Sequence, residues 1–313
     1  MKLIPVRFLL KSFGDYDESI KTFKEQIVQD FSLNQEQNRA FSIIANHAVS
    51  STPEPLHMYL GGMARTGKSQ VIKAVTTFFT LIDEQSRIVL LAPTGTAACL
   101  IGGSTYHSFL CLSDADNVSL KRLSLLRAKL ETVDYIFIDE VSMIGMREIY
   151  RISAQLARIG NRTDHAYGGF NMIFAGDFAQ LPPPTKMSPL YGLISNKHSG
   201  SYINQQSIIG KALWHQTTVV VILRVNMQQR GISKADHCLQ LVLSNMRYKG
   251  CTTADLAHLK SLRVSIGSTI FTNPMKRNIS AITALNSQRD KLNKTGCDWF
   301  AFDSNQELDF FFL

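Results

Sequence analysis

The chain has 313 residues, 45% of them hydrophobic and 19% charged, which is typical of a globular protein with one large domain or one domain and part of a second. No stretch approaches the roughly 20 apolar residues of a membrane-spanning helix, so we expect a soluble protein without a membrane partner. The 33 Lys and Arg residues against 25 Asp and Glu residues give a net charge of +8, which favours nucleic acid as a partner, although a solvated basic surface explains it equally well.

The cysteines and the N-terminus indicate a reducing compartment and no targeting signal. Five cysteines are present and none are spaced as C-x-x-C, so neither a disulfide framework nor a zinc site is predicted. The apolar run Leu3–Leu10 is interrupted by Arg7 and has no small-residue cleavage site after it.

Apolar runs along the chain predict an α/β fold. Residues 1–30 carry no motif and are predicted to be a lead-in with a helix across Glu18–Val28. From Leu33 to Leu223, short apolar runs alternate with helix-like segments, as in a doubly wound parallel sheet flanked by helices. The predicted strands are Met58–Leu60, Ile88–Leu91, Tyr135–Ile138, Met172–Ala175 and Val219–Leu223.

Each of the first four strands runs into a polar or glycine-rich segment. These segments are Gly61–Ser69, Pro93–Thr96, Asp139–Ser142 and Gly176–Gln180. Parallel strands present their carboxyl ends on one edge of a sheet, where ligands bind. We therefore expect the four segments to converge on a single crevice.

The remainder of the chain predicts a long loop, a helical region and the start of another α/β layer. Between Pro184 and Gly210 no period is visible, which indicates a surface excursion. After Arg224 the pattern is helical to about Leu262, and a strand at Ser268–Thr272 and a helix at Ala281–Leu292 follow. The predicted organisation is a lead-in at 1–30, a motor domain at 31–230, and a helical connection with an incomplete second domain at 231–313.

A phosphate-binding loop follows the first predicted strand. Its residues match G-x-x-x-x-G-K-[ST] and precede a helical segment, the context that separates this motif from a chance glycine-lysine turn. Backbone N–H groups of such a loop cradle phosphates, Lys68 neutralises the β and γ oxygens, and the Ser69 hydroxyl binds Mg²⁺. The loop is Gly62, Met63, Ala64, Arg65, Thr66, Gly67, Lys68 and Ser69. The predicted ligands are therefore ATP and Mg²⁺.

Two adjacent carboxylates follow the third predicted strand. Asp139 is suited to hold the metal and Glu140 to act as the base that polarises the attacking water. An acidic pair after a strand is also common as a helix N-cap. About seventy residues after a phosphate loop, the catalytic interpretation is favoured.

Two further segments carry polar groups that suit nucleotide sensing and DNA contacts. Gln180 lies just past the fourth strand, where its amide would sense the γ-phosphate, although a proline-stiffened turn is the alternative. Thr94, Thr105 and His107 suit phosphate contacts and base stacking on a single strand. Helix caps and a satisfied histidine are the alternative for these three.

The ordered motifs resemble those of the petite-integration-frequency DNA helicases, superfamily 1B enzymes that move 5′ to 3′ on single-stranded DNA. The helicase region of Helitron-type transposons is the most similar variety. The similar segments run from about Leu33 to the end of the chain and are LNQEQ, GGMARTGKSQ, APTGTAA, GGSTYHS, FIDEVSM and YGGFNMIFAGDFAQLPP.

The resemblance implies a RecA-like domain in which Gln37 reads adenine and Gln180 couples the nucleotide state to DNA. It implies catalytic roles for Lys68, Asp139 and Glu140, metal binding by Ser69 and Asp139, and DNA contacts at Thr94, Thr105 and His107. Nuclear location and roles in DNA repair, recombination and telomere maintenance are implied in the same way.

Three departures from the family pattern affect the expected activity. Arg65 stands where glycine is usual, which would weaken nucleotide binding if the backbone did not tolerate it. Gln228 stands where the arginine that completes the ATP site is usual, so Arg224 and Arg230 become the candidates for an arginine finger. Later family motifs are missing, so we expect nucleotide binding with reduced hydrolysis.

The leading hypothesis is a partial ATP-dependent 5′-to-3′ DNA helicase, and the alternative is a non-catalytic nucleotide-binding or DNA-binding remnant. A phosphate-loop kinase or signalling GTPase is disfavoured, because the chain has no N-K-x-D segment and such proteins would not explain GDFAQLPP.

Overall fold

The computed structural model describes residues 18–50, 54–112, 120–184, 187–193, 201–225, 234–263, 282–283 and 285–307. The chain divides into two compact units, Met1–Cys238 and Leu239–Leu313. The predicted domain limit at residue 230 and the predicted strand Ser268–Thr272 lie outside the described residues, so both stay predictions.

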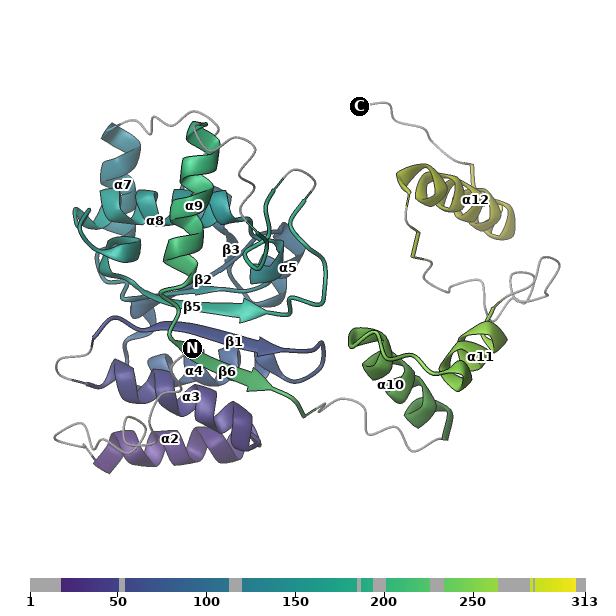
Figure 1. Ribbon diagram of the computed structural model, residues 1–313, viewed down its shortest axis with the longest axis horizontal. Coiled ribbons are helices and arrows are strands. Elements are labelled where there is room, and N and C mark those ends of the chain that lie inside the picture. Colours follow the sequence, from purple (N-terminus) through teal and green to yellow (C-terminus); the bar gives the residue numbers. More distant parts are fainter. Residues whose placement is uncertain are drawn as a thin grey trace. The chain divides into compact units, whose positions relative to one another are not determined.

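A six-stranded parallel sheet forms the centre of the first unit (Figure 1). Its strand order is β3-β2-β4-β5-β1-β6, and every neighbouring pair is parallel. The strands are β1 (His57–Gly62), β2 (Ile88–Ala92), β3 (Ser104–Thr105), β4 (Tyr135–Ile138), β5 (Asn171–Gly176) and β6 (Val219–Leu223). The predicted α/β class and the five predicted strands are confirmed, and β3 is an additional edge strand.

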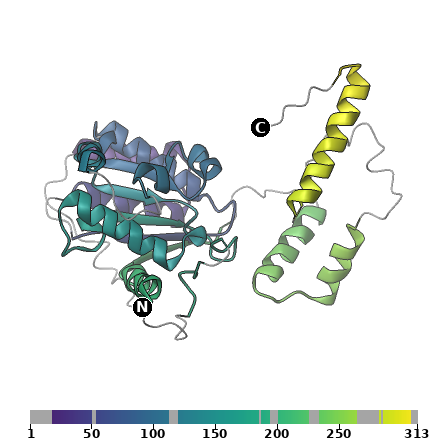
Figure 2. The same ribbon diagram turned by 90° about the horizontal axis from the view of Figure 1, so that it is seen from above.

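Helices cover both faces of the sheet, as Figures 1 and 2 show. On one face lie α2 (Glu18–Asp30), α3 (Gln35–Ala48) and α4 (Lys68–Leu81). On the other lie α7 (Leu120–Leu130), α8 (Met146–Gly160) and α9 (Tyr202–Trp214). Short helices at the strand ends are η1 (Gln85–Arg87), α5 (Gly95–Leu100), α6 (Tyr106–Phe109), η2 (Val141–Met143) and η3 (Ala166–Gly169).

Burial on both faces explains why the strands are continuous apolar runs. Along β4, Tyr135 and Phe137 belong to the core beneath α3 and α4, whereas Ile136 and Ile138 belong to the core beneath α8. Parallel strands with two covered faces lack the alternating pattern of half-exposed strands. The predicted helix at Glu18–Val28 is confirmed as α2, whose Ile27 is 1% exposed and joins the first core.

The prediction of a surface excursion from Pro184 to Gly210 is wrong for its last part, because α9 begins at Tyr202. Ser201 caps this helix by accepting a hydrogen bond from the N–H of Asn204. An added Cβ on Gly210 would lie 1.8 Å from the carbonyl oxygen of Met146, so α9 packs closely on the start of α8. The buried residues of α9 are Gln206 and Gly210, and Leu213 and Trp214 at its end pack against the core, so its inner face has no regular apolar stripe that periodicity would reveal.

The second unit contains α11 (Thr253–Ser261), α12 (Asn286–Ser304) and most of α10 (Lys234–Arg247). Helices α10 and α11 confirm the predicted helical pattern between Arg224 and Leu262 for the residues described there. Helix α12 extends beyond the predicted end at Leu292. Asn293, Thr295 and Gly296 are weak helix formers, which ends the sequence signal before the helix itself ends.

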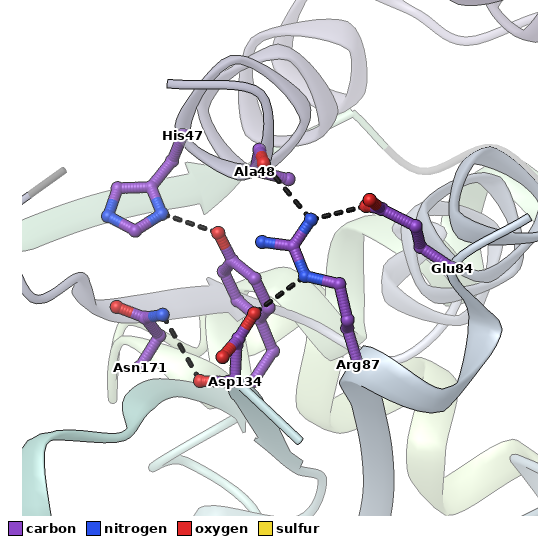
Figure 3. Close-up of polar contacts among 7 residues, drawn as sticks. His47, Ala48, Glu84, Arg87, Asp134 and Asn171 are labelled. Atoms are coloured by element: carbon purple, nitrogen blue, oxygen red, sulfur yellow. Dashed lines mark hydrogen bonds and ion pairs between the residues drawn. The ribbon is translucent and has the colours of Figure 1, made fainter. Parts of the chain in front are cut away.

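A polar network closes the amino-terminal edge of the sheet (Figure 3). The Arg87 guanidinium donates to Asp134 Oδ2 at 2.6 Å and to the carbonyl oxygen of Ala48 at 3.3 Å, and also pairs with Glu84. The Asn171 amide donates to the carbonyl oxygen of Asp134 at 3.1 Å. The network therefore ties α3, η1 and the starts of β2, β4 and β5 together.

A half-buried histidine lies beside this network. Nδ1 of His47 is 2.6 Å from the Tyr135 hydroxyl, and Nε2 is 2.8 Å from the carbonyl oxygen of Glu54. Since a carbonyl only accepts, Nε2 carries the proton and Nδ1 accepts from the tyrosine in the neutral ring. Burial lowers the pKa of His47, which keeps the ring neutral and so preserves these two hydrogen bonds.

None of the described helices combines the length and apolar character that a bilayer-spanning helix requires.

Candidate nucleotide site

The carboxyl ends of β1, β4 and β5, which are neighbours in the sheet, open onto one cavity of about 540 Å³. Three of the four predicted segments contribute to its lining, and the fourth, Pro93–Thr96, does not. The predicted site residues in the lining are Gln37, Ala64, Arg65, Gly67, Lys68, Ser69, Asp139, Glu140 and Gln180. The sheet topology therefore brings together residues that are more than a hundred positions apart.

The phosphate loop between β1 and α4 contains two left-handed residues. Gly67 has φ 89°, and an added Cβ there would lie 2.1 Å from Nε2 of Gln37, so only glycine fits. Arg65 has φ 68° and is exposed, so a non-glycine residue takes the conformation that glycine favours. As the N-cap, Gly67 offers no side chain to the first N–H groups of α4, and such helix N-termini bind phosphates.

Lys68 and Ser69 are the first two residues of α4. The ammonium group of Lys68 donates to the carbonyl oxygens of Gly62 at 2.7 Å and Met63 at 3.2 Å. These contacts fold the side chain back over the loop, at the place where phosphates would lie. The Ser69 side chain is exposed at the cavity. The loop thus presents the Lys68 ammonium and the Ser69 hydroxyl to an anion bound there, and the exposed Arg65 adds a second positive charge to the lining.

The acidic pair lies at the end of β4 with its pKa values raised. Oδ1 of Asp139 accepts the N–H of Glu140 at 2.9 Å, and Glu140 has φ 52°. Burial raises the pKa of Asp139, although Lys68 opposes this. Burial also raises the pKa of Glu140, and the charges of Asp139 and Asp177 add to the rise. A carboxylate with a raised pKa is a better base, and a cation would relieve the crowding of negative charge.

The end of β5 forms a turn that brings Gln180 to the cavity. Asp177 is 2% exposed, its Oδ1 accepts the N–H of Ala179 at 3.1 Å, and its carbonyl oxygen accepts the N–H of Gln180 at 2.9 Å. The Gln180 side chain is exposed. The turn alternative and the sensing prediction are therefore compatible, because the turn leaves the Gln180 amide at the cavity.

Gln37 joins the start of α3 to the phosphate loop. Its Oε1 accepts the N–H of Asn34 at 3.0 Å, and its Nε2 donates to the carbonyl oxygen of Thr66 at 3.0 Å. Gln37 is 1% exposed. The amide keeps one N–H and one lone pair beyond these two bonds, so it retains capacity for a base edge.

Comparison with known proteins agrees with this arrangement. The sequence pattern of the PIF1-like helicase family matches residues 32–243, which is more than half of the chain. The chain belongs to the PIF1-like helicase family. It is 32% identical over 164 residues to the ATP-dependent DNA helicase Pif1 of Bdellovibrio bacteriovorus, covering 50% of this chain and 34% of that protein. It is 33% identical over 136 residues to the human ATP-dependent DNA helicase PIF1, covering 42% of this chain and 20% of that protein. The chain thus spans about a third or less of these relatives.

Solved PIF1-type structures share the fold. The Pif1 helicase of Candida albicans superposes with a TM-score of 0.64 at 20% identity, covering 85% of this chain and 54% of that one. A Bacteroides Pif1 helicase solved with ADP-AlF3 and ssDNA gives a TM-score of 0.58 at 20% identity, covering 88% and 58%. These likenesses support the RecA-like assignment of the parallel sheet.

The candidate DNA-contacting residues of this PIF1-like helicase lie outside the cavity. Thr94 caps α5 by accepting the N–H of Ala97, and Thr105 caps α6 by accepting the N–H of Ser108. Nε2 of His107 lies 3.4 Å from Oε2 of Glu148. The helix-cap alternative therefore describes Thr94 and Thr105, whereas His107 lies at ion-pair distance from Glu148 without a hydrogen bond, and the DNA role stays a prediction.

Neither candidate arginine finger is part of the described cavity. The backbone N–H groups of Arg224 and Val225 donate to Oε2 of Glu36, and the exposed Arg224 is not among the lining residues. Arg230 lies outside the described residues. The finger of this PIF1-like helicase therefore stays unassigned.

Four lining residues are missing from the sequence prediction: Phe31, Ser32, Gln70 and Lys73. Lys73 follows Ser69 by one helical turn, so its spacing on α4 was the available signal. The Gln70 amide donates to the carbonyl oxygen of Phe31 at 3.1 Å and so joins α4 to the end of α2. The sequence holds no signal for that contact.

The donor set fits Mg²⁺ carried by a nucleotide. Mg²⁺ prefers oxygen ligands and usually takes one or two protein oxygens with substrate phosphates and water. Ser69 offers a hydroxyl and Asp139 a carboxylate, both at the cavity. The raised pKa of Asp139 follows from burial of a negative charge, which a divalent cation would stabilise.

Proposed function

We propose that this chain is the nucleotide-binding motor part of an ATP-dependent DNA helicase that moves 5′ to 3′ along single-stranded DNA. The observation that supports this best is the single cavity that gathers the phosphate loop, the acidic pair and Gln180 from three strand ends. The proposed reaction is that of the relatives named as ATP-dependent DNA helicases, and the proposed partner is the ssDNA bound in the Bacteroides complex.

In the proposed reaction the chain binds and orients the triphosphate. The N–H groups at the start of α4 hold the phosphate oxygens, and the Lys68 ammonium moves from the loop carbonyls to the β and γ oxygens. Ser69 and Asp139 would hold Mg²⁺, which when bound neutralises charge on the phosphates. Gln37, beside the loop, would contact the base.

Glu140 takes the proton of the attacking water. Its pKa is raised by burial and by neighbouring carboxylates, which makes it a stronger base while Lys68 opposes full protonation. Gln180 senses whether the γ-phosphate is present, and its turn after β5 links that state to the rest of the sheet edge. Thr94, Thr105 and His107 would contact the strand, and Arg224 or Arg230 would complete the site.

The experiment is ATP hydrolysis by the purified chain with and without single-stranded DNA, together with binding of a fluorescent non-hydrolysable ATP analogue. Lys68→Ala should weaken analogue binding by roughly 10-fold to 100-fold, because a hydrogen bond to a charged group contributes about 1.5–3 kcal/mol. Lys73→Ala is the matched control, since it removes an exposed lysine of the same helix and cavity. An affinity that falls no further in Lys68→Ala than in Lys73→Ala would refute the site.

A non-catalytic nucleotide-binding remnant is the second candidate. The position of Arg224 outside the cavity lining favours it, because an arginine finger supplies about 10³-fold or more in turnover. Analogue binding by the wild-type chain without turnover above that of Lys68→Ala would support this candidate. Nuclear location and roles in repair, recombination and telomere maintenance stay predictions from the family resemblance.

A further inference from the structure

A carboxylate is buried in α8, away from the nucleotide cavity. Glu148 is 3% exposed, and its Oε1 is 3.0 Å from Nη1 of Arg151 in the next helical turn. Its Oε2 has no hydrogen-bond partner among the described residues. Oε2 does lie 3.4 Å from Nε2 of His107, an ion-pair distance without hydrogen-bond geometry. One oxygen of this buried carboxylate is therefore aimed at a histidine that it does not yet bind.

Such an arrangement is costly for stability alone. A buried carboxylate requires partners for both oxygens, and an unsatisfied buried acceptor costs about 1–3 kcal/mol, more when charged. Arg151 satisfies only one oxygen in the described contacts. A buried polar atom without a partner calls for a functional explanation or for a contact made in another state.

The histidine that faces Glu148 follows a short strand of the sheet. Ser104 and Thr105 form β3, which pairs with Leu91 and Ala92 of β2. The His107 ring lies against the ring of Tyr106, with centroids 4.1 Å apart and an interplanar angle of 30°. Its side chain is 43% exposed. One face of the ring therefore lies on Tyr106 and Nε2 lies toward Glu148, while part of the ring is accessible to solvent.

We propose that Glu148 is a positioning residue for single-stranded DNA, acting through His107. The carboxylate selects the ring form that carries a proton on Nε2 and fixes the plane of the imidazole. Nδ1 and the face opposite Tyr106 are then presented to one nucleotide of the strand. Contact with that nucleotide turns the ring so that the Nε2–H points at Oε2, which completes the hydrogen bond across the 3.4 Å separation.

This inference rests on the proposed function, in which His107 contacts the strand. It is tested by a double-mutant cycle of His107→Ala and Glu148→Gln, read by fluorescence anisotropy of labelled oligo(dT). His107→Ala should weaken binding by roughly 10-fold, because a base-stacking contact contributes about 1–3 kcal/mol. Glu148→Gln should weaken it by a few-fold, and the double variant no more than His107→Ala alone, since both act through one contact.

Glu84→Gln is the matched control. Glu84 also pairs with an arginine three residues later, Arg87, which belongs to the network at the amino-terminal edge of the sheet (Figure 3). It should leave oligo(dT) binding unchanged. Wild-type affinity in Glu148→Gln, or losses that multiply in the double variant, would overturn the proposal. Wild-type binding of the ATP analogue and the thermal midpoint separate these outcomes from simple unfolding.

A second measurement does not depend on DNA. The nitrogen-15 NMR spectrum of the His107 imidazole should show a proton on Nε2 in the wild-type chain, and the Nε2 chemical shift should change in Glu148→Gln, which removes the charged acceptor. A ring protonated on Nδ1 instead would overturn the proposal even if a variant failed to fold. A wild-type chain without any oligo(dT) affinity would refute the proposed DNA function, whereas the spectrum would still report on the Glu148–His107 contact.

Discussion

Replacing Arg65 by glycine should stabilise the protein without changing nucleotide affinity. Arg65 has φ 68°, a conformation that costs an L-residue about 1–2 kcal/mol. Glycine loses about 0.4–1 kcal/mol of this gain through its freer unfolded chain. Mid-range values leave a net gain of about 0.8 kcal/mol, or roughly 2–3 °C in the unfolding midpoint of a domain this size.

The loop already has the backbone that glycine would adopt, so the analogue Kd should change by less than roughly threefold, about 0.7 kcal/mol. The assays are thermal unfolding and analogue titration on wild type, Arg65→Gly and Arg65→Ala. The alanine variant removes the same side chain and charge but keeps the Cβ. Equal stabilisation by alanine and glycine would refute the reasoning, because the effect would then come from the side chain and not from the backbone.

Three further predictions concern buried groups. Asp139→Asn should stabilise the fold by about 0.5–2 kcal/mol at neutral pH. Burial raises the pKa of Asp139, so its ionised form lowers the stability of the fold at pH values above about 4, the pKa of aspartate in the unfolded chain. The stabilisation by Asp139→Asn should therefore vanish below that pH. Equal stabilisation at pH 3.5 and 7.5 would contradict this. Gly210→Ala should cost about 1–3 kcal/mol in urea unfolding, because its Cβ would meet Met146, whereas Gly95→Ala, with open space around its Cβ, should cost far less. The pKa of His47 is lower in the folded chain than its value of about 6.5 in the unfolded chain, so the neutral ring stabilises the fold above about pH 6.5. This stabilisation is lost as the pH falls below that value. Urea unfolding should therefore detect a lower free energy of unfolding at pH 5.5 than at pH 7.5, and His47→Asn should reduce the difference.

Strand positions were predictable because the strands of a parallel sheet covered on both faces are continuous apolar runs in the sequence. Phe137 and Ile138 point to opposite faces and are both fully buried, so the strand must be apolar throughout. Strand β3 has no apolar run, because it consists of Ser104 and Thr105 and pairs with β2 through its backbone. Helix α9 was hidden for another reason, since the close approach at Gly210 is a tertiary contact.

The cavity at the strand ends was predictable as a set of segments but not in its details. The rule that ligands bind at the carboxyl ends of parallel strands identified Lys68, Asp139 and Gln180 as neighbours. No local pattern could indicate that the Gln37 amide bonds Thr66, because that contact crosses 29 positions of the chain. Glu148 was also missed, since a glutamate in an amphipathic helix is ordinarily a solvent-facing residue.

Two strained backbone positions line the cavity. Arg65 and Glu140 are both left-handed, both are non-glycine and both line the cavity. Such residues cost about 1–3 kcal/mol each and persist only where the surroundings fix them. Around Glu140 the fixing groups are Oδ1 of Asp139, which accepts its N–H, and the fully buried Val141 that follows. The direction of the Glu140 carboxylate is thus set by the main chain, which leaves its oxygens available for the proton of the attacking water in the proposed reaction.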